Sequence, residues 1–109
     1  PLIASPPADL EQIYQAKEIL LQQIDNPPSL LTLARQVRLN DCTLKRGFKQ
    51  VFGTTVFGYL HRHRMEQARS LLLDRQLSVT EIAHKVGYRN AFSTAFRKTY
   101  GMSPKAMLR

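Results

Sequence analysis

The sequence has one cysteine, few acidic residues and no long hydrophobic run, and each shortage excludes a class of protein. The single Cys42 excludes an internal disulfide and a cysteine-rich metal cluster, which fits a reducing compartment. No stretch approaches the roughly 18 apolar residues of a membrane span, and no signal-peptide pattern opens the chain. These absences predict a soluble, cytoplasmic protein without a membrane partner.

Acidic residues are half as numerous as basic ones, 8 against 16, so the formal net charge is +8 and the pI is about 10.2. Residues 1–26 hold one base and four acids, whereas residues 27–109 hold 15 bases and four acids. Such a basic excess on a folded domain favours polyanions, first nucleic acid and second an anionic membrane surface. On charge alone, a merely soluble basic surface stays open.

Comparing the chain with itself reveals two copies of one motif. The pairs that align at an offset of 49 residues are Ser29 with Ser78, Leu33 with Ile82, Ala34 with Ala83, Val37 with Val86 and Leu39 with Tyr88. Residues 48–53 then align with residues 96–101 at an offset of 48. The second copy is therefore one residue shorter, between Tyr88 and Phe92.

Each copy reads as a helix, a tight turn and a second helix, which is the helix-turn-helix pattern. Ser29 and Ser78 are expected to cap the first helix of each copy, Glu81 to complete a capping box, and Asp9 to cap the first helix of the chain. We predict an all-α, homeodomain-like fold of about seven helices. Two helix-turn-helix subdomains, residues 9–52 and 75–109, are joined by a long helix at residues 53–74, and residues 1–8 end a linker.

The joining helix has a length with a functional consequence. About twenty residues span about 30 Å, and major grooves on one face of B-DNA recur about every 34–36 Å. Such a helix could hold two reading helices in adjacent grooves. Its predicted buried stripe is Val56, Tyr59, Leu60, Ala68, Leu71 and Leu72. Arg64 lies beside this stripe and is expected to pair with a carboxylate.

The two turns differ at one position. Gly87 can adopt a positive φ without strain, but the first copy has Arg38 there. We predict that the first turn either relaxes its geometry or carries about 1 kcal/mol of strain.

Three stretches resemble a known family: LTLARQVRLNDCTLKRGFKQVFGTTVFGYL, RMEQARSLLLDRQLSVTEIAHKVGY and FSTAFRKTYGMSP. Over residues 9–109 the chain resembles the DNA-binding domain of the AraC/XylS family of bacterial transcription regulators, and residues 39–60 most resemble its siderophore-responsive branch. The resemblance implies an activator that binds double-stranded promoter DNA in two major-groove segments, with RNA polymerase as a partner. It also implies an effector-binding or dimerisation domain before Pro1, where the start without methionine suggests that part of a longer protein is missing.

The family's base-reading positions fall on the second helix of each copy. They are Cys42, Thr43, Lys45 and Arg46 in the first copy and Asn90, Ala91 and Thr94 in the second. Arg46 or Lys45 can hydrogen-bond guanine, and Cys42 offers an apolar contact to a thymine methyl group. For Lys45 and Arg46, a solvated or phosphate-only role stays open. The candidates for phosphate contact, at helix starts or as basic clamps, are Ser29, Lys49, Thr54, Thr55, Ser78, Arg89, Arg97, Lys98 and Ser103.

The family pattern has two more residues between Gly87 and Phe96 than this chain. Either the chain has a true deletion at the start of its second reading helix, or residues are missing from the sequence between Asn90 and Phe92. We favour missing residues, because losing two residues would turn the apolar stripe of Phe92 and Phe96 by about 200° relative to the turn.

An enzymatic reading finds little support, so we predict neither a catalytic nor a metal site and no cofactor. His61 and His63 diverge by about 200° on a helix and make a poor metal pair. Cys42 lacks a neighbouring histidine base, and there is no glycine-rich phosphate loop. Two alternatives to a DNA-binding regulator remain: a DNA-targeting module of a larger enzyme, and a basic protein-interaction or membrane-surface module.

Overall fold

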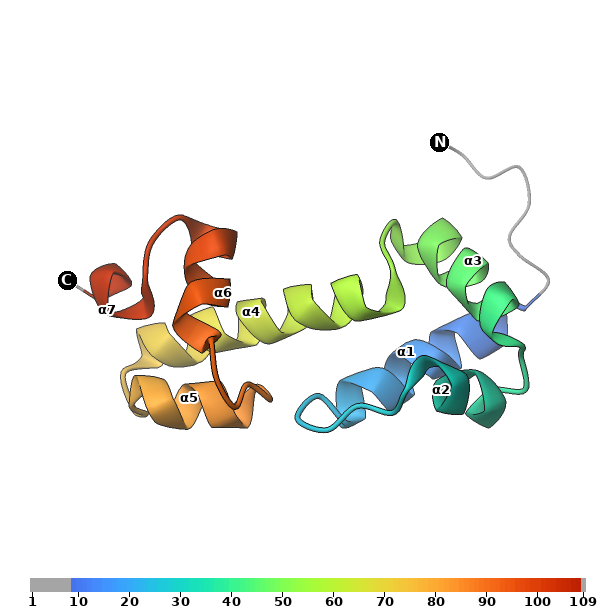
Figure 1. Ribbon diagram of the computed structural model, residues 1–109, viewed down its shortest axis with the longest axis horizontal. Coiled ribbons are helices and arrows are strands. Elements are labelled where there is room, and N and C mark those ends of the chain that lie inside the picture. The colour runs from blue at the N-terminus through green and yellow to red at the C-terminus, as the bar shows by residue number, and fades with distance from the viewer. Residues whose placement is uncertain (1–8, 109) are drawn as a thin grey trace. The chain divides into compact units, whose positions relative to one another are not determined.

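The computed structural model describes residues 9–108, which form α-helices joined by short turns (Figure 1). The helices are α1 (Leu10–Gln22), α2 (Leu30–Gln36), α3 (Asp41–Phe52), α4 (Val56–Asp74), α5 (Val79–Lys85), α6 (Phe92–Tyr100) and α7 (Pro104–Met107). The predicted all-α fold of about seven helices is confirmed over the part of the chain that the structure describes. The expected linker, residues 1–8, lies outside it.

The described residues gather into two compact units. Unit 1 comprises residues 9–23 and 27–60, and unit 2 comprises residues 24–26 and 61–108. The division falls inside α4, between Leu60 and His61, so this one helix contributes to both units.

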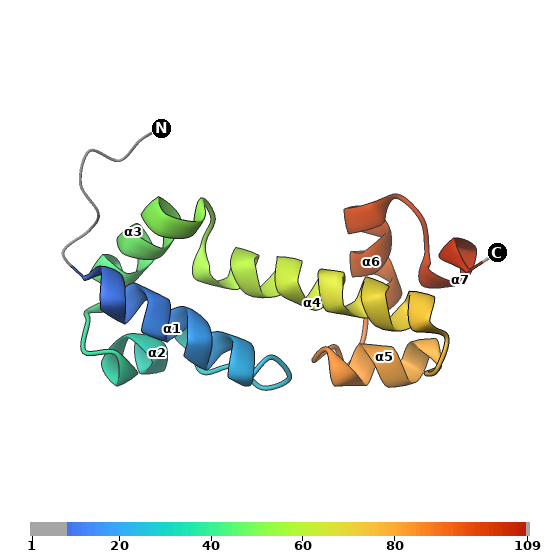
Figure 2. The same cartoon turned by 180° about the vertical axis from the view of Figure 1, so that it is seen from behind.

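In unit 1, α2 and α3 pack beside α1 (Figure 2). The buried side chains from these three helices include Ile13, Leu20, Leu33, Leu44 and Phe48. Gly47 makes the close approach of α3 to α1 possible, because a Cβ atom there would lie 2.6 Å from Cδ1 of Ile13. Ala34 is also buried, as expected of a small residue where two helices cross.

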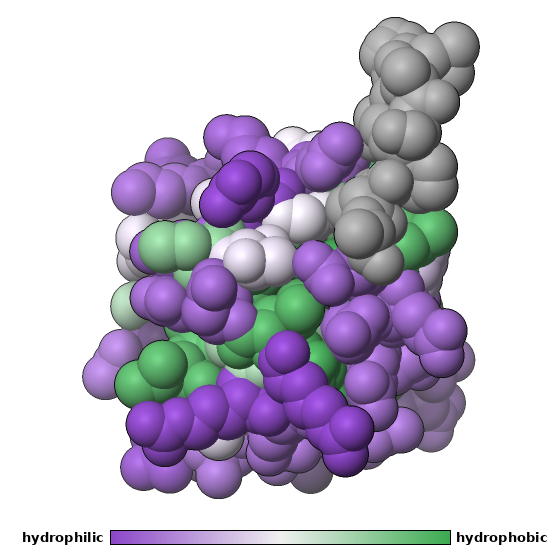
Figure 3. All heavy atoms as spheres, turned by 90° about the vertical axis from the view of Figure 1, so that its right-hand side faces the viewer, coloured by the Kyte–Doolittle hydropathy of each residue, from purple (hydrophilic) through white to green (hydrophobic). Residues whose placement is uncertain are grey.

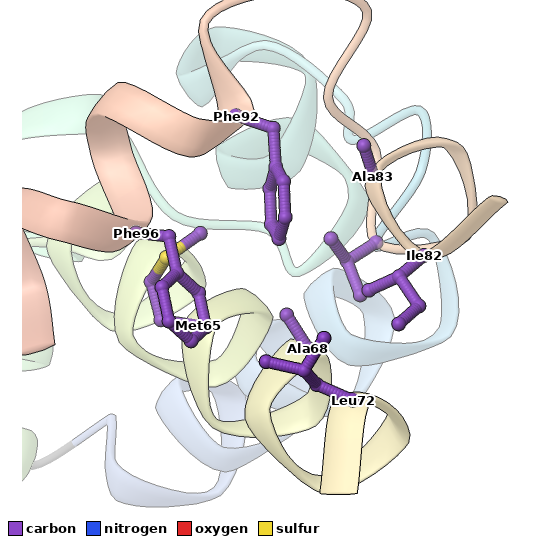
Figure 4. Packing of buried hydrophobic residues seen from close by; sticks show 8 residues of the cluster. Met65, Ala68, Leu72, Ile82, Ala83, Phe92 and Phe96 are labelled. Carbon is purple, nitrogen blue, oxygen red and sulfur yellow. The ribbon is translucent and has the colours of Figure 1, made fainter. Parts of the chain in front are cut away.

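In unit 2, side chains from α4, α5 and α6 form one hydrophobic core (Figure 4). Its buried members are Met65, Ala68, Leu72, Ile82, Ala83, Val86, Phe92 and Phe96. Met65 is fully buried although it is absent from the predicted stripe of α4, whereas Leu71, which is in that stripe, is only partly buried.

Serine caps start three of the helices, as their spacing predicts. The hydroxyl oxygens of Ser29, Ser78 and Ser103 each accept the backbone N–H three residues later, at 3.1 Å. Glu81 completes the capping box, because its carboxylate accepts the Ser78 backbone N–H at 2.8 Å. The Ser78 backbone N–H, and after it the Ser78 hydroxyl, hold the pKa of the Glu81 carboxyl below its ordinary value.

The starts of α1, α3 and α4 differ in how they are capped. Asn40 caps α3, with its side-chain oxygen accepting the Thr43 N–H at 2.7 Å. The long helix begins at Val56 rather than residue 53, because Gly53 takes the left-handed conformation that ends α3 and the Thr55 hydroxyl caps α4. The predicted cap at Asp9 was wrong: Asp9 precedes α1, but its side chain makes no capping hydrogen bond.

Arg38 adopts the strained conformation that one of the two predictions for the first turn required. Its φ is +63°, in the left-handed region, and the equivalent Gly87 has a φ of +94°. The first turn therefore keeps its geometry and accepts the strain. Replacing Arg38 with glycine should raise the free energy of unfolding by about 0.5–1 kcal/mol, since relief of the strain exceeds the added flexibility of the unfolded chain.

Urea unfolding of Arg38→Gly measures this gain. The matched control is Arg35→Gly, three residues earlier on an exposed position of α2, which should instead lose about 1 kcal/mol because the residue is helical. Equal losses in both variants would contradict the strain at Arg38.

Arg64 has a structural role, but the carboxylate partner predicted for it was wrong. Its Nε donates to the backbone carbonyl oxygen of Ile24 at 2.9 Å, and its guanidinium lies over the Tyr88 ring, 5.4 Å from the centroid. Ile24 follows α1 and belongs to unit 2. The arginine therefore fixes this loop through a backbone acceptor that no sequence pattern reveals.

Candidate nucleic-acid interface

The exposed face of α3 brings together four of the residues that the sequence predicts to contact DNA. Cys42, Lys45, Arg46 and Lys49 are spaced by three, one and three residues, so they share one side of the helix. They line an open pocket of about 840 Å³ that also includes the start of α4. The remaining lining residues are Leu30, Gln50, Thr55, Val56 and Phe57.

Within the part of the chain that the structure describes, the basic side chains of this face form no ion pair. In residues 9–108, no carboxylate forms an ion pair with Lys45, Arg46 or Lys49. Their charges are therefore free to meet an external anion. Gln50 lies on the same face, four residues after Arg46, and was not among the predicted residues. Its amide can recognise adenine. Its spacing alone would have identified it.

Thr43 lies at the edge of this face. It is partly buried and lines an adjoining hollow with Arg46 and Gln50, which also includes Asp9 and Ile13. Its backbone N–H is already used by the Asn40 cap.

In unit 2, the candidates near the turn also meet around one hollow. Arg89, Asn90, Ala91 and Thr94 line a pocket of about 260 Å³ together with residues of α5. Ser93 lines it as well and was not among the predicted residues. The internal repeat could have found it, because Ser93 aligns with Lys45 at the offset of 48. Arg97 and Lys98 are exposed further along α6.

The start of α6 shows how the shorter second copy is accommodated. The chain runs from Asn90 through Ala91 directly into α6 at Phe92, and Ala91 has a φ of +58° in the left-handed region. α6 has 9 residues against 12 in α3, yet Phe92 and Phe96 are both buried. The apolar stripe therefore reaches the core without further residues, and the choice between a true deletion and missing residues stays open. The later helix start and the turn at Ala91 restore the apolar stripe to the core.

A hydrogen-bonded histidine anchors this turn to α4. His61 Nδ1 lies 2.8 Å from the Tyr88 hydroxyl, and Nε2 lies 3.3 Å from the Thr99 hydroxyl of α6. The Thr99 hydroxyl donates to the Ala95 carbonyl oxygen, so it accepts a hydrogen bond from His61 Nε2. Tyr88 then donates to Nδ1; burial raises its pKa and keeps the phenol protonated. No sequence pattern predicts this contact, which joins residues 27 positions apart.

The remaining phosphate candidates lie at helix starts. Ser29 precedes α2, Thr54 and Thr55 precede α4, Ser78 precedes α5 and Ser103 precedes α7. Backbone N–H groups in a first helical turn lack partners inside the helix, which makes them suited to phosphate.

The surface on the side of unit 1 is mostly hydrophilic, with a limited group of hydrophobic residues among polar ones (Figure 3). Among the described residues, no helix is both long and apolar enough to cross a membrane. Residues 9–108 also hold no group of three or more histidine, cysteine, aspartate or glutamate side chains that could bind a metal ion.

An AraC-type family model described as "Helix-turn-helix domain" matches residues 33–109, from α2 to the end of the chain. The chain belongs to the AraC/XylS family. It has the fold of that family's helix-turn-helix DNA-binding domain, in agreement with the resemblance of the sequence. The family consists of transcription regulators.

Relatives within the AraC/XylS family cover most of the chain. It is 45% identical over 72 residues to the regulatory protein PchR of Pseudomonas aeruginosa. This match covers 66% of this chain and 24% of PchR. It is 43% identical over 75 residues to the transcriptional activator RhaS of Escherichia coli, 67% of this chain and 27% of RhaS. The chain thus spans about a quarter of the length of these relatives.

A solved structure supports the same assignment. The DNA-binding domain of the global transcriptional factor AdpA, in complex with a target DNA, matches with a TM-score of 0.74 and 30% identity. The match covers 94% of this chain and 90% of that one.

Proposed function

We propose that this AraC/XylS domain binds double-stranded promoter DNA sequence-specifically and reads two adjacent major-groove segments with α3 and α6. The observation that carries the proposal is the exposed face of α3, where Cys42, Lys45, Arg46 and Lys49 stand together. No carboxylate among residues 9–108 pairs with its three positive charges. The second helix of a helix-turn-helix motif is the one that enters the major groove. AdpA, which shares this fold, is described in a complex with target DNA.

We assign the contacts by side-chain chemistry. Arg46 and Lys45 pair with guanine, and Cys42 touches a thymine methyl group. Thr43, Asn90, Ala91 and Thr94 complete the base-facing set in this proposal. The phosphate-facing set is Ser29, Lys49, Thr54, Thr55, Ser78, Arg89, Arg97, Lys98 and Ser103.

The long helix takes the role of a connector in this proposal. With 19 residues, α4 is about 28 Å long. We propose that it joins two helix-turn-helix subdomains, residues 9–52 and 75–109, and sets the spacing of the two segments that are read, about one turn of DNA apart.

The family supports further proposals about the whole protein. We propose that it activates transcription, as the name of its relative RhaS states for that protein. RNA polymerase would be its partner, an N-terminal domain would bind an effector or dimerise, and the protein would act in the cytoplasm. From the resemblance of residues 39–60 we propose that it belongs to the siderophore-responsive branch.

Selection from randomised duplex DNA at near-physiological salt, followed by footprinting of the winner, tests the proposed function. Two protected major-groove segments about one turn apart are expected. Salt dependence alone would not discriminate, because any polycation shows it on DNA. Recovery without any sequence enrichment would overturn sequence-specific binding and favour the protein-interaction module instead.

Replacing Arg46 with alanine should relax the base preference at one base pair. The binding free energy to the site with the preferred base should become weaker by about 1–3 kcal/mol. Fluorescence anisotropy with the selected site and its single-base variants measures the effect. Arg35→Ala is the matched control, since it removes the same charge from an exposed position of α2 outside the reading helix. An equal loss on every sequence would make Arg46 a phosphate contact.

A further inference from the structure

The two reading helices are unequal in length and in the side chains that they expose. At the offset of 48, the first three residues of α3, residues 41–43, correspond to residues 89–91, which precede α6. The second reading helix thus lacks the first turn that its counterpart has. Base contacts in helix-turn-helix proteins come mainly from the N-terminal part of the reading helix. The shortening therefore removes the part that discriminates best.

The groove-facing side chains of α6 are also shorter. Lys45 and Arg46 of α3 correspond to Ser93 and Thr94, which are exposed in the first turn of α6. A lysine or arginine can pair with guanine in particular, whereas serine and threonine hydroxyls accept or donate to several bases. The long cations of α6, Arg97 and Lys98, stand in its last turn. Such residues meet phosphate, which carries no sequence information.

The position of α6 is fixed by its packing and does not offset the lost first turn. Phe92 and Phe96 hold α6 in the core, and His61 ties both the turn and the helix to α4 through Tyr88 and Thr99. The register of α6 is therefore set by unit 2 itself, with Ser93 and Thr94 on its open side.

We infer that base discrimination in this protein is concentrated in α3, and that α6 acts as a phosphate-gripping helix that adds affinity but little specificity. The inference rests on the proposed function and assigns base discrimination to α3 and phosphate contact to α6. The target site would have one strictly read segment, the α3 half-site, and one permissive segment, the α6 half-site.

Affinities for every single-base variant of the selected site test this division. Substitutions in the α3 half-site should weaken binding about 5- to 150-fold, the range of a lost bidentate contact. Substitutions in the α6 half-site should change it less than about threefold. Arg97→Ala and Lys98→Ala should weaken binding equally on all sequences and should each lower the salt slope by about one.

A reciprocal exchange supplies the matched control. Ser93→Lys with Thr94→Arg should create a base preference of at least about fivefold in the α6 half-site. Lys45→Ser with Arg46→Thr should abolish most of the preference in the α3 half-site. All four side chains are exposed, so both variants should unfold at the temperature of the original protein.

The outcomes separate the two proposals. Losses above about fivefold in both half-sites would overturn the unequal division and leave bipartite recognition standing. No new preference in the Ser93→Lys, Thr94→Arg variant would overturn the explanation by side-chain length. Failure of the selection to enrich any sequence would instead overturn the proposed function.

Discussion

Replacing Phe96 with alanine is expected to lower the free energy of unfolding by about 3–5 kcal/mol, the range for a phenylalanine lost from a tight core. Phe96 is fully buried, and its ring centroid lies 5.8 Å from that of Phe92 and 4.8 Å from that of Tyr100. Removal of the ring leaves a cavity between α4, α5 and α6. Small domains have only about 5–15 kcal/mol of total stability, so a large share of it would be lost.

Urea unfolding followed by circular dichroism measures this loss. Phe57→Ala is the matched control, because the Phe57 side chain is 43% exposed and its truncation should cost less than about 1 kcal/mol. Similar losses in the two variants would show that Phe96 is not the centre of the core.

Replacing Gly87 with alanine should lower the free energy of unfolding by about 2.5–5 kcal/mol, for two reasons that add. The φ of +94° lies where a side chain costs about 1–2 kcal/mol. An added Cβ would also lie 2.7 Å from the Ile24 carbonyl oxygen and 2.7 Å from Nη2 of Arg64. The new methyl group would therefore force apart a charge-assisted hydrogen bond worth about 1.5–3 kcal/mol.

Gly101 supplies the control that separates these two reasons. Its φ is +80°, but nothing lies within 4 Å of the position that a Cβ would take. Gly101→Ala should therefore show the backbone cost alone, about 1–2 kcal/mol. If thermal or urea unfolding gave equal losses for both glycines, the contact with Arg64 and Ile24 would contribute nothing.

Features that depend on near neighbours in the chain could be predicted from the sequence. The serine caps join residues three apart, and the common face of Lys45, Arg46 and Lys49 follows from the helical period. The strain at Arg38 was visible because the repeat placed a glycine at the equivalent position. The same reasoning, carried one step further, would have found Ser93.

Features that depend on distant partners could not be predicted. Arg64 bonds a backbone carbonyl 40 residues away, and His61 meets hydroxyl groups 27 and 38 residues away. Met65 is buried because α5 and α6 close over it, which the stripe of α4 alone does not reveal. The burial of Phe92 and Phe96 in the shorter copy has a related cause, because the left-handed Ala91 resets the direction of the chain before α6.

The boundary between the units within α4 limits how this protein can be divided. A fragment that ended at Leu60 would retain only the first five residues of α4, and one that began at His61 would start in mid-helix with unpaired N–H groups. A five-residue remnant of α4 does not persist as a helix in water, because helix nucleation is unfavourable. Neither copy of the motif is therefore a portable module by itself. Exchange of one reading specificity for another between proteins would have to proceed by substitutions on α3 and not by grafting half of the chain.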